Sequence, residues 1–388
     1  MNFNLTEEQL AVKEAAREFA QNELLPGVID RDNHMTYPKE QIKMMGELGF
    51  LGMMVSPKYN GGGMDTLSYT LAMEEISKID NSASVIMSVN NSLICWGIEK
   101  FGSEEQKQKY LTKLSTGENI GAFCLSEPEA GSDATSQRTT AIDMGDHYLI
   151  NGTKNWITSG GTADVHLVVA QTDADKKHHG INAFIVETNW DGVSIGAKED
   201  KLGIRSSDTH TIMYTDVKVP KENRIGEDGF GFKFAMKVLS GGRIGIASQA
   251  LGIAQGAFEL AKKYSQERVA FGKPIYKHQI IGFKLADMAT DIEASRLLVH
   301  RAAQLKDSGV NFDSAASMAK MFASETAMKH TVEAVQIHGG YGFVKEYHVE
   351  RLMRDAKITQ IYEGTSEIQR LVIARNILKG QIYEPTLF

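Results

Sequence analysis

The chain has 388 residues, and this length predicts two or three domains at about 100–200 residues each. Its 42 basic and 49 acidic side chains give a formal net charge of −7, which disfavours partners with a phosphate backbone. A mean hydropathy of −0.25, the lack of any apolar run near about 18 residues and the lack of a signal peptide pattern indicate an intracellular protein without membrane insertion. Two cysteines cannot build a disulfide framework or a cysteine zinc site, so we expect no thiolate-bound metal.

The first part of the chain has the pattern of helices. A capping box over 6–9 precedes apolar residues at helical spacing. Helical patterns return over 66–80 and 84–100, and a second capping box opens a charged helix over 103–117. We therefore predict an all-α N-terminal domain over residues 1–120.

The next hundred residues change to short runs that are rich in β-branched and aromatic side chains. Asn151-Gly152 lies between the first two runs and predicts a hairpin there. We predict a small antiparallel β domain over residues 121–226. Its strands are expected over 147–150, 155–158, 165–171, 183–187 and 211–214.

The last part of the chain is helical again. No proline lies between Pro274 and Pro385, and amphipathic stretches cover 280–305, 315–337 and 346–361. Such lengths predict a four-helix bundle over residues 227–388. The fold class is therefore α+β, with an N-terminal all-α domain, a middle antiparallel β domain and a C-terminal helical bundle.

Several common catalytic motifs are absent from the sequence. There is no GxGxxG, no GxxxxGK[ST], no HExxH and no GxSxG. Ser317-x-x-Lys320 matches the SxxK pattern without its companion motifs, and we interpret it as a chance match. His348-x-Glu350 lacks a PCxxC partner, which excludes a zinc deaminase.

Two segments of the β domain have residue types that suit a ligand. Residues 124–133 combine hydroxyls, glycine and acids, which fits either a backbone-rich ligand cradle or a simple turn. In the segment 154–161, regular strand alternation would put Trp156 and Thr158 on one face. A flat ligand could stack there, whereas a lone Trp in a core is the structural alternative.

A third segment, 361–369, places an acid between apolar neighbours. Glu363 follows Ile361 and Tyr362, and such partial desolvation raises a carboxyl pKa toward working pH. Gly364 leaves room for a substrate to reach the Glu363 backbone N–H. Ser366-x-x-Gln369 predicts a capping box that opens a new helix. An unremarkable Glu beside a helix–helix turn is the alternative.

Taken together, these segments resemble the acyl-CoA dehydrogenase family along essentially the whole chain. Leu125–Asp133 resembles its first signature, and Gln336–Phe343, through Arg351 and Asp355, resembles its second. The segments 156–158, 267–272 and 361–365 follow in the family's order. Within the family, residues 242–255 and 361–374 are most similar to short-chain (butyryl-CoA) members.

The resemblance implies an FAD enzyme that introduces a trans double bond between Cα and Cβ of an acyl-CoA thioester. By this resemblance Glu363 removes the α-proton while the β-hydride passes to flavin N5. The Glu363 N–H and a ribityl hydroxyl of FAD then stabilise the thioester oxygen. It further implies a homotetramer built as a dimer of dimers, and electron-transfer flavoprotein as the acceptor.

The resemblance also assigns residues to each part of the site. The flavin cradle comprises Phe123, Leu125, Ser126, Gly131, Ser132, Trp156, Ile157 and Thr158. The ADP half is held across a subunit interface by Arg268, Phe271, Gln279, Gln336, Ile337, His338, Gly339 and Gly340, with Thr365, Ser366 and Glu367 completing that shell. The CoA and acyl contacts are Ser132, Ser240, Gly241, Gly242, Arg243, Tyr362 and Gly364.

Two positions bear on these assignments. Some family members carry the base immediately before the arginine that corresponds to Arg243, and here that position is Gly242, which strengthens the assignment to Glu363. Short-chain members usually have an acid where Ser240 stands, so the CoA contact at Ser240 is open.

Other functions remain as alternatives. A branched- or medium-chain acyl-CoA dehydrogenase comes first. An acyl-CoA oxidase-like flavoenzyme is disfavoured because acyl-CoA oxidases are longer and nitroalkane oxidases have Asp where Glu363 stands. A non-catalytic DNA-binding relative is disfavoured by the charge of −7. We expect the cytoplasm of a bacterium, with the mitochondrial matrix as the second possibility.

Overall fold

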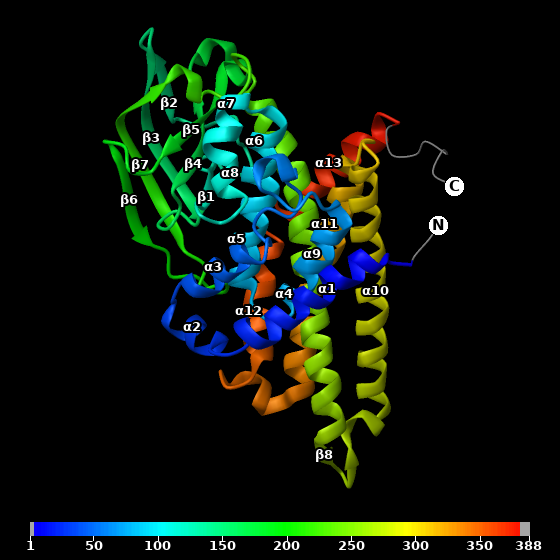
Figure 1. The fold of residues 1–388 in the computed structure, drawn as a ribbon. Coiled ribbons are helices and arrows are strands. Elements are labelled where there is room, and N and C mark those ends of the chain that lie inside the picture. The colour runs from blue at the N-terminus through cyan, green and yellow to red at the C-terminus, as the bar shows by residue number, and fades with distance from the viewer. Residues whose placement is uncertain (1–3, 381–388) are drawn as a thin grey trace.

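The computed structural model describes residues 4–380. A group of shorter helices, a curled sheet and a bundle of long helices follow one another along the chain (Figure 1). The expected fold class is confirmed. Among the described residues, no helix is long and apolar enough to cross a membrane.

The N-terminal helices surround a shared apolar core. Both predicted capping boxes, at Thr6 with Gln9 and at Ser103 with Gln106, are present. The helices are α1 (Glu7–Phe19), α2 (Val28–His34), α3 (Lys39–Glu47), α4 (Thr66–Ser77), α5 (Asn81–Ser88), α6 (Trp96–Phe101), α7 (Glu104–Gln106) and α8 (Thr112–Leu114), with π-helical turns over Ala20–Leu24, Val89–Cys95 and Lys107–Leu111.

The sheet has the strand order β1-β4-β2-β3-β7-β6, and β5 pairs with β4. Its pairs are antiparallel except that β1 runs parallel to β4 and a short parallel contact joins β2 to β4. The parallel pair departs from the expected purely antiparallel domain. The strands are β1 (Gly121–Cys124), β2 (Thr140–Asp143), β3 (His147–Thr158), β4 (Val165–Gln171), β5 (Ile181–Glu187), β6 (Val193–Lys198) and β7 (Thr209–Pro220).

The predicted hairpin at Asn151-Gly152 is wrong, because both residues lie inside the continuous strand β3. The register of β3 against β7 shifts at this point, which is a β-bulge. The Asn151 side chain donates to the Asp216 carboxylate and accepts from the Asp216 N–H. A Cβ on Gly152 would lie 2.4 Å from Thr139 Oγ1, so glycine is needed for close packing rather than for a turn.

The C-terminal part is a bundle of long helices. Helix α9 runs from the sheet into the bundle and packs along α11 (Figure 1). Its first half, with Phe234 and Val238, belongs to the core shared by the N-terminal helices and the sheet, whereas Ile244–Ala261 belongs to the bundle core. The elements are α9 (Gly231–Glu267), β8 (Val269–Ala270), β9 (Lys273–Pro274), α10 (Gln279–Asp307), α11 (Asp313–His338), α12 (His348–Thr359) and α13 (Ser366–Leu378).

Candidate active site

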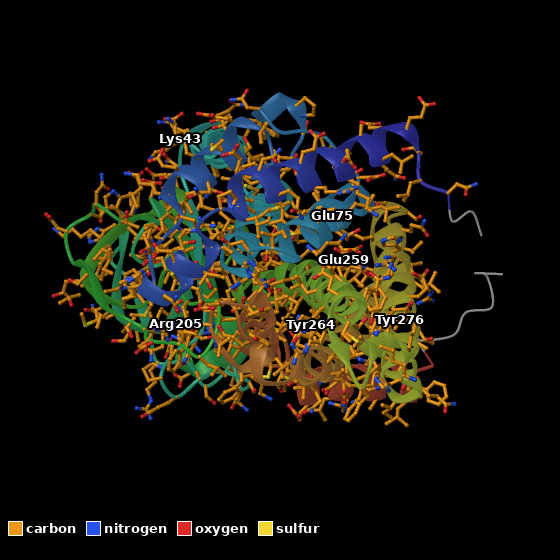
Figure 2. The ribbon with its side chains drawn as sticks, turned by 90° about the horizontal axis from the view of Figure 1, so that it is seen from below. Lys43, Glu75, Arg205, Glu259, Tyr264 and Tyr276 are labelled. Atoms are coloured by element: carbon orange, nitrogen blue, oxygen red, sulfur yellow. The ribbon has the colours of Figure 1, made fainter. Side chains whose placement is uncertain are left out.

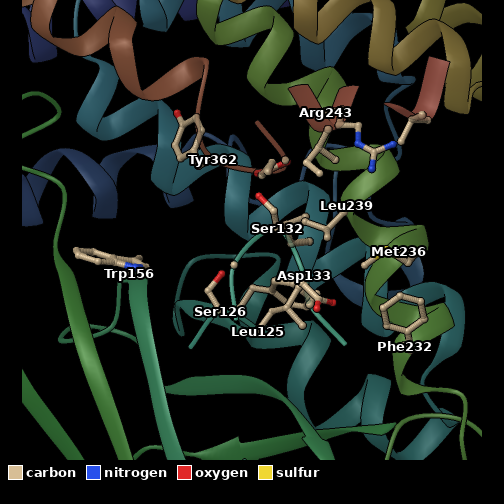
Figure 3. Close-up of a pocket in the computed structure, with 18 of the residues that line it drawn as sticks. Leu125, Ser126, Ser132, Asp133, Trp156, Phe232, Met236, Leu239, Arg243 and Tyr362 are labelled. Atoms are coloured by element: carbon tan, nitrogen blue, oxygen red, sulfur yellow. The ribbon is translucent and has the colours of Figure 1, made fainter. Parts of the chain in front are cut away.

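A cavity of about 450 Å³ lies where the sheet, α9 and the segment before α13 meet. Trp156 stands on its sheet side, and Phe232, Met236 and Leu239 of α9 stand on the other side (Figure 3). The cavity brings together predicted residues from three distant parts of the chain. These are Phe123, Leu125, Ser126, Gly131, Ser132, Trp156, Ile157, Thr158, Arg243, Tyr362, Glu363 and Gly364.

Glu363 lies on the cavity wall in the turn between α12 and α13. Its φ is 53° and that of Gly364 is 91°, so two consecutive residues adopt left-handed conformations. The Glu363 Oε2 atom is buried and has no hydrogen-bond partner among the described residues. Burial raises the pKa of Glu363 to about 7, although the positive charges of Lys320 and Arg243 oppose this rise.

The Glu363 carboxylate occupies space that Gly242 leaves free. A Cβ at position 242 would lie 2.0 Å from Glu363 Oε2 and 2.8 Å from Leu93 Cδ2. Any side chain on α9 at this position would therefore displace the carboxylate. The glycine and the acid form one structural unit.

Two side chains hold the turn that carries Glu363 by donating hydrogen bonds to its carbonyl groups. Lys320 Nζ donates to the Gly364 carbonyl at 2.8 Å, and the Gln369 amide donates to the same carbonyl at 2.8 Å and to that of Glu363 at 3.3 Å. The Glu363 backbone N–H meets no backbone acceptor among the described residues. It is therefore free to donate to a ligand.

The predicted capping box at Ser366 and Gln369 is wrong. Thr365 caps α13, and its hydroxyl accepts from the Ile368 N–H at 3.3 Å. The Gln369 amide turns back to the carbonyls of the preceding turn instead, and the Ser366 hydroxyl is buried without a partner among the described residues.

Trp156 is not a core residue, since 61% of it is exposed. Its φ is 62°, and the register of β3 against β7 shifts between Lys154 and Ile157. A bulge therefore replaces the regular alternation that the sequence suggests. As a result Trp156, Ile157 and Thr158 all line the cavity.

The loop after β1 rests on a buried ion pair that no sequence motif indicated. The Lys154 ammonium, with 0% exposure, donates to the Leu125 carbonyl at 3.0 Å and to Glu127 Oε1 at 2.7 Å. The N–H groups of Arg138 and Thr139 also donate to Glu127. Burial alone would raise the pKa of Glu127, but Lys154 and these donors lower it.

The apolar wall was also missed. Phe232, Met236 and Leu239 follow one another at helical spacing on α9, ahead of the predicted Arg243, and all line the cavity. The helical spacing of these apolar residues was the feature of the sequence that could have indicated the wall. Val85, Val89 and Leu93 complete the wall from the N-terminal helices.

The residues assigned to the ADP half lie elsewhere in the chain. Arg268, Ile337, His338, Gly339 and Gly340 line a separate cavity of about 640 Å³. Figure 2 looks onto the end of the bundle, where Tyr264 of that cavity and Tyr276 lie. Within one chain, the structure does not bring this group to the cavity of Glu363. Phe271 is 95% exposed at the same end, and Gln279 and Gln336 are exposed.

Two predicted substrate positions, Ser240 and Gly241, and two predicted residues of the ADP shell, Thr365 and Glu367, do not line the main cavity. Ser240 lines another cavity, of about 720 Å³, and its hydroxyl donates to the Met236 carbonyl at 3.2 Å. A Cβ on Gly241 would lie 3.8 Å from the Ser92 carbonyl oxygen and 3.9 Å from Lys306 Nζ. Thr365 is the N-cap of α13, and Glu367 lies in its first turn. The structure does not bring these residues onto the wall that carries Glu363.

Comparisons with known proteins agree with this geometry. Three family models match, described as the N-terminal, middle and C-terminal domains of acyl-CoA dehydrogenase, over residues 6–118, 122–217 and 229–378. A short-chain specific acyl-CoA dehydrogenase of Clostridium acetobutylicum is 50% identical over 98% of this chain and 100% of its own. A mitochondrial short-chain specific enzyme of Mus musculus is 50% identical over 97% of this chain and 91% of its own.

Solved structures give the same result. Butyryl-CoA dehydrogenase from Megasphaera elsdenii superposes with a TM-score of 0.96 at 50% identity, over 97% of this chain and all of that one. A chain from work on the electron transferring flavoprotein of Acidaminococcus fermentans gives 0.97 at 51% identity, over 98% and 100%. PigA with FAD and proline gives 0.94 at 29% identity, over 98% and 100%.

Proposed function

The chain belongs to the acyl-CoA dehydrogenase family, and from that premise we propose that it dehydrogenates short-chain acyl-CoA thioesters to trans-2-enoyl-CoA. The observation that carries this proposal is the Glu363 carboxylate, which stands without a hydrogen-bond partner among the described residues, on a cavity wall, with a pKa raised to about 7. A base whose pKa lies near the working pH is best suited to accept a proton in the transition state.

In this proposal Glu363 accepts the α-proton of the bound thioester. An α-proton is too weakly acidic for an ordinary carboxylate, so the charge that develops on the thioester oxygen must be stabilised. The Glu363 backbone N–H meets no backbone acceptor among the described residues and can supply one of the donors. The apolar side chains of α5 and α9 on this wall offer water no hydrogen bonds, and a water-poor site strengthens such an interaction.

The main cavity fits the flavin of FAD. Trp156 offers an exposed aromatic face, and Ser126 and Thr158 offer hydroxyls beside it. We propose that the segments 123–132 and 156–158 hold the isoalloxazine ring, and that Ser132, Tyr362 and Gly364 contact the thioester. FAD, when bound, supplies the acceptor for the hydride equivalent that leaves the β-carbon.

We further propose a homotetramer, arranged as a dimer of dimers, in which the ADP half of FAD is held by a neighbouring subunit. Arg268 suits a pyrophosphate because its fork can bond two oxygens. The bundle end around it exposes a group of large apolar side chains, which supports burial in an assembly. They are Val269, Phe271, Tyr276, Ile280, Phe283, Tyr341, Phe343 and Val344.

The relatives support the finer parts of the proposal. Short-chain substrates are favoured by the 50% identical short-chain specific enzymes, and electron-transfer flavoprotein as acceptor is favoured by the Acidaminococcus fermentans structure. The bacterial relatives favour the cytoplasm.

The test is anaerobic mixing of the purified, FAD-loaded protein with acyl-CoAs of four to twelve carbons and with branched four- and five-carbon thioesters. We expect flavin bleaching and enoyl-CoA formation with an optimum at four carbons. Each methylene is worth only about 1–3 kcal/mol in an apolar pocket, so a broad profile up to eight carbons fits as well. An optimum at twelve carbons, or at a branched thioester, would overturn the short straight-chain assignment.

The same sample separates the other functions. Rapid re-oxidation by oxygen with peroxide release would identify an oxidase. A colourless protein that cannot be reconstituted with FAD, together with salt-dependent DNA binding, would identify the non-catalytic alternative.

A further inference from the structure

Lys320 lies on α11 beneath the turn that carries Glu363, with 0% exposure. The SxxK pattern, interpreted from the sequence as a chance match, therefore has both of its side chains at the site. Ser317 Oγ accepts from Arg243 Nη1 at 3.3 Å, and Lys320 Nζ donates to the Gly364 carbonyl at 2.8 Å. The pattern does not build a nucleophile here. It supports the residues around the carboxylate.

We propose that Lys320 is a positioning residue, which holds the Glu363–Gly364 turn in its left-handed conformation and sets the proton affinity of the Glu363 carboxylate through its charge. This inference rests on the proposed function of Glu363 as the base.

The positioning part follows from the backbone of the turn. A non-glycine residue with a positive φ costs about 1–3 kcal/mol and persists only where neighbouring contacts enforce it. Glu363 is such a residue, and the contacts are the Lys320 ammonium and the Gln369 amide on the turn's carbonyls. These two side chains come from different helices, α11 and α13. Together they fix the direction of the free Glu363 N–H and of its side chain.

The charge part follows from the groups that face one another around the turn. The Glu363 carboxylate faces two cations, Lys320 and Arg243, and the phenols of Tyr69 and Tyr362. Burial lowers the pKa of Lys320 to about 7, and the positive charge of Arg243 adds to this decrease. The negative charges of Glu363, Glu325 and Glu367 oppose it. Asp313 faces Arg243 from the start of α11.

The charges of Lys320 and Glu363 each favour the charged form of the other, so the two titrations are linked. A protonated Lys320 favours the charged form of Glu363 and so lowers its pKa. Removing the ammonium must raise the pKa of Glu363, because only Arg243 then opposes the effect of burial.

The first experiment measures the rate of flavin reduction by butyryl-CoA between about pH 5.5 and about pH 9. The variants are Lys320→Met, which removes both the hydrogen bond and the charge, and Lys320→Arg, which restores a cation and a donor. We expect Lys320→Met to move the midpoint upward by about one pH unit and to lower the plateau about tenfold. Lys320→Arg should return the midpoint toward the wild-type value.

A second readout isolates proton removal from electron transfer. Acetyl-CoA has α-protons but no β-carbon, so it cannot be dehydrogenated. Exchange of its methyl protons with deuterated solvent, followed by proton NMR, should show the same upward shift in Lys320→Met. A lysine with a merely structural role would reduce both rates by one factor at every pH and would leave the midpoints in place.

Two controls separate the possible failures. Lys306→Met removes a half-buried lysine on α10, whose pKa burial lowers to about 8 and which is not among the charges facing Glu363. It should not move the midpoint. If Glu363→Gln abolishes reduction while Lys320→Met leaves the midpoint unmoved, the inference about Lys320 fails alone. If Glu363→Gln still reduces its flavin, the proposed base fails, whatever Lys320 does.

Folding provides the last criterion. FAD content and the unfolding midpoint are recorded for each variant, and Lys320→Gln is the second neutral variant should Lys320→Met not fold. If none of the lysine variants folds with FAD while Glu363→Gln does, Lys320 serves the stability of the bundle and the proposal is wrong.

Discussion

Glu127 and Glu363 each lie near a fully buried lysine, and their environments differ. In the β domain, Glu127 bonds directly to Lys154 at 2.7 Å and accepts two backbone N–H groups, and its pKa is lowered. In the main cavity, the Lys320 ammonium bonds to the Gly364 carbonyl rather than to Glu363. Glu363 Oε2 has no partner among the described residues, and its pKa is raised to about 7.

The difference separates a carboxylate that stabilises a fold from one that is available for chemistry. A buried charge with all its hydrogen bonds made is held in its charged form. A buried carboxylate kept near cations but not bonded to them retains a high proton affinity and a free lone pair. The same two residue types thus support the flavin loop at one place and a candidate base at the other.

The largest effect is expected at the fully bonded pair. Lys154→Met leaves the buried Glu127 carboxylate without its counter-charge, which costs about 3–5 kcal/mol of unfolding free energy. Denaturant unfolding at neutral pH measures this loss. The matched control is Lys109→Met, where a lysine that is 59% exposed pairs with Glu187, and the cost should be at most about 1 kcal/mol. Equal losses in the two variants would remove the distinction drawn for Glu127.

A smaller effect is expected from crowding the carboxylate that has no bond. Gly242→Ala places a methyl group 2.0 Å from the position that Glu363 Oε2 occupies, so the carboxylate must move. A displacement of about 1 Å in a reacting group can cost about 10² in rate. The rate of flavin reduction at saturating butyryl-CoA measures it. Gly241→Ala, whose Cβ meets nothing nearer than 3.8 Å, should lose far less, and equal losses would contradict the steric account.

The smallest effect concerns stability as a function of pH. Because the pKa of Glu363 is raised from 4.5 to about 7, the folded state holds this proton more tightly than the unfolded state. Its contribution to stability is complete below about pH 4.5 and is lost as the pH rises through about 7. Glu363→Gln should therefore be more stable than wild type by about 1–3 kcal/mol at about pH 8. Unfolding at both pH extremes checks this, and a gain that is equal at about pH 4 would contradict it.

Much of the fold could be predicted from the sequence because local patterns control it. The capping boxes at Thr6 and Ser103 and the strand over 165–171 depend on neighbours in the chain, and the structure has them. The hairpin prediction at Asn151-Gly152 was wrong because β-bulges and hairpin turns favour the same residue types. Here the bulge is stabilised by hydrogen bonds between Asn151 and Asp216 across the sheet, which local sequence does not show.

The candidate site shows the same limit. The raised pKa of Glu363 could be expected from its apolar neighbours, and Gly242 could be noticed as a missing side chain. The clash that links these two residues, and the contact of Lys320 with Gly364, could not. Both contacts join residues more than 40 positions apart in sequence, so only the packing of α9, α11 and the turn before α13 creates them.

The most direct measurement is stopped-flow flavin reduction by butyryl-CoA in two matched variants, Glu363→Gln and Glu127→Gln, each loaded with FAD. A positioned base contributes about 10²–10⁴ in rate. We predict a loss of that size for Glu363→Gln, with FAD and acyl-CoA binding retained. For the part of the Glu127→Gln protein that folds and binds FAD, the rate of flavin reduction should stay within about tenfold of the wild-type rate. A Glu363→Gln variant that also stays within about tenfold would show that the proton acceptor lies elsewhere.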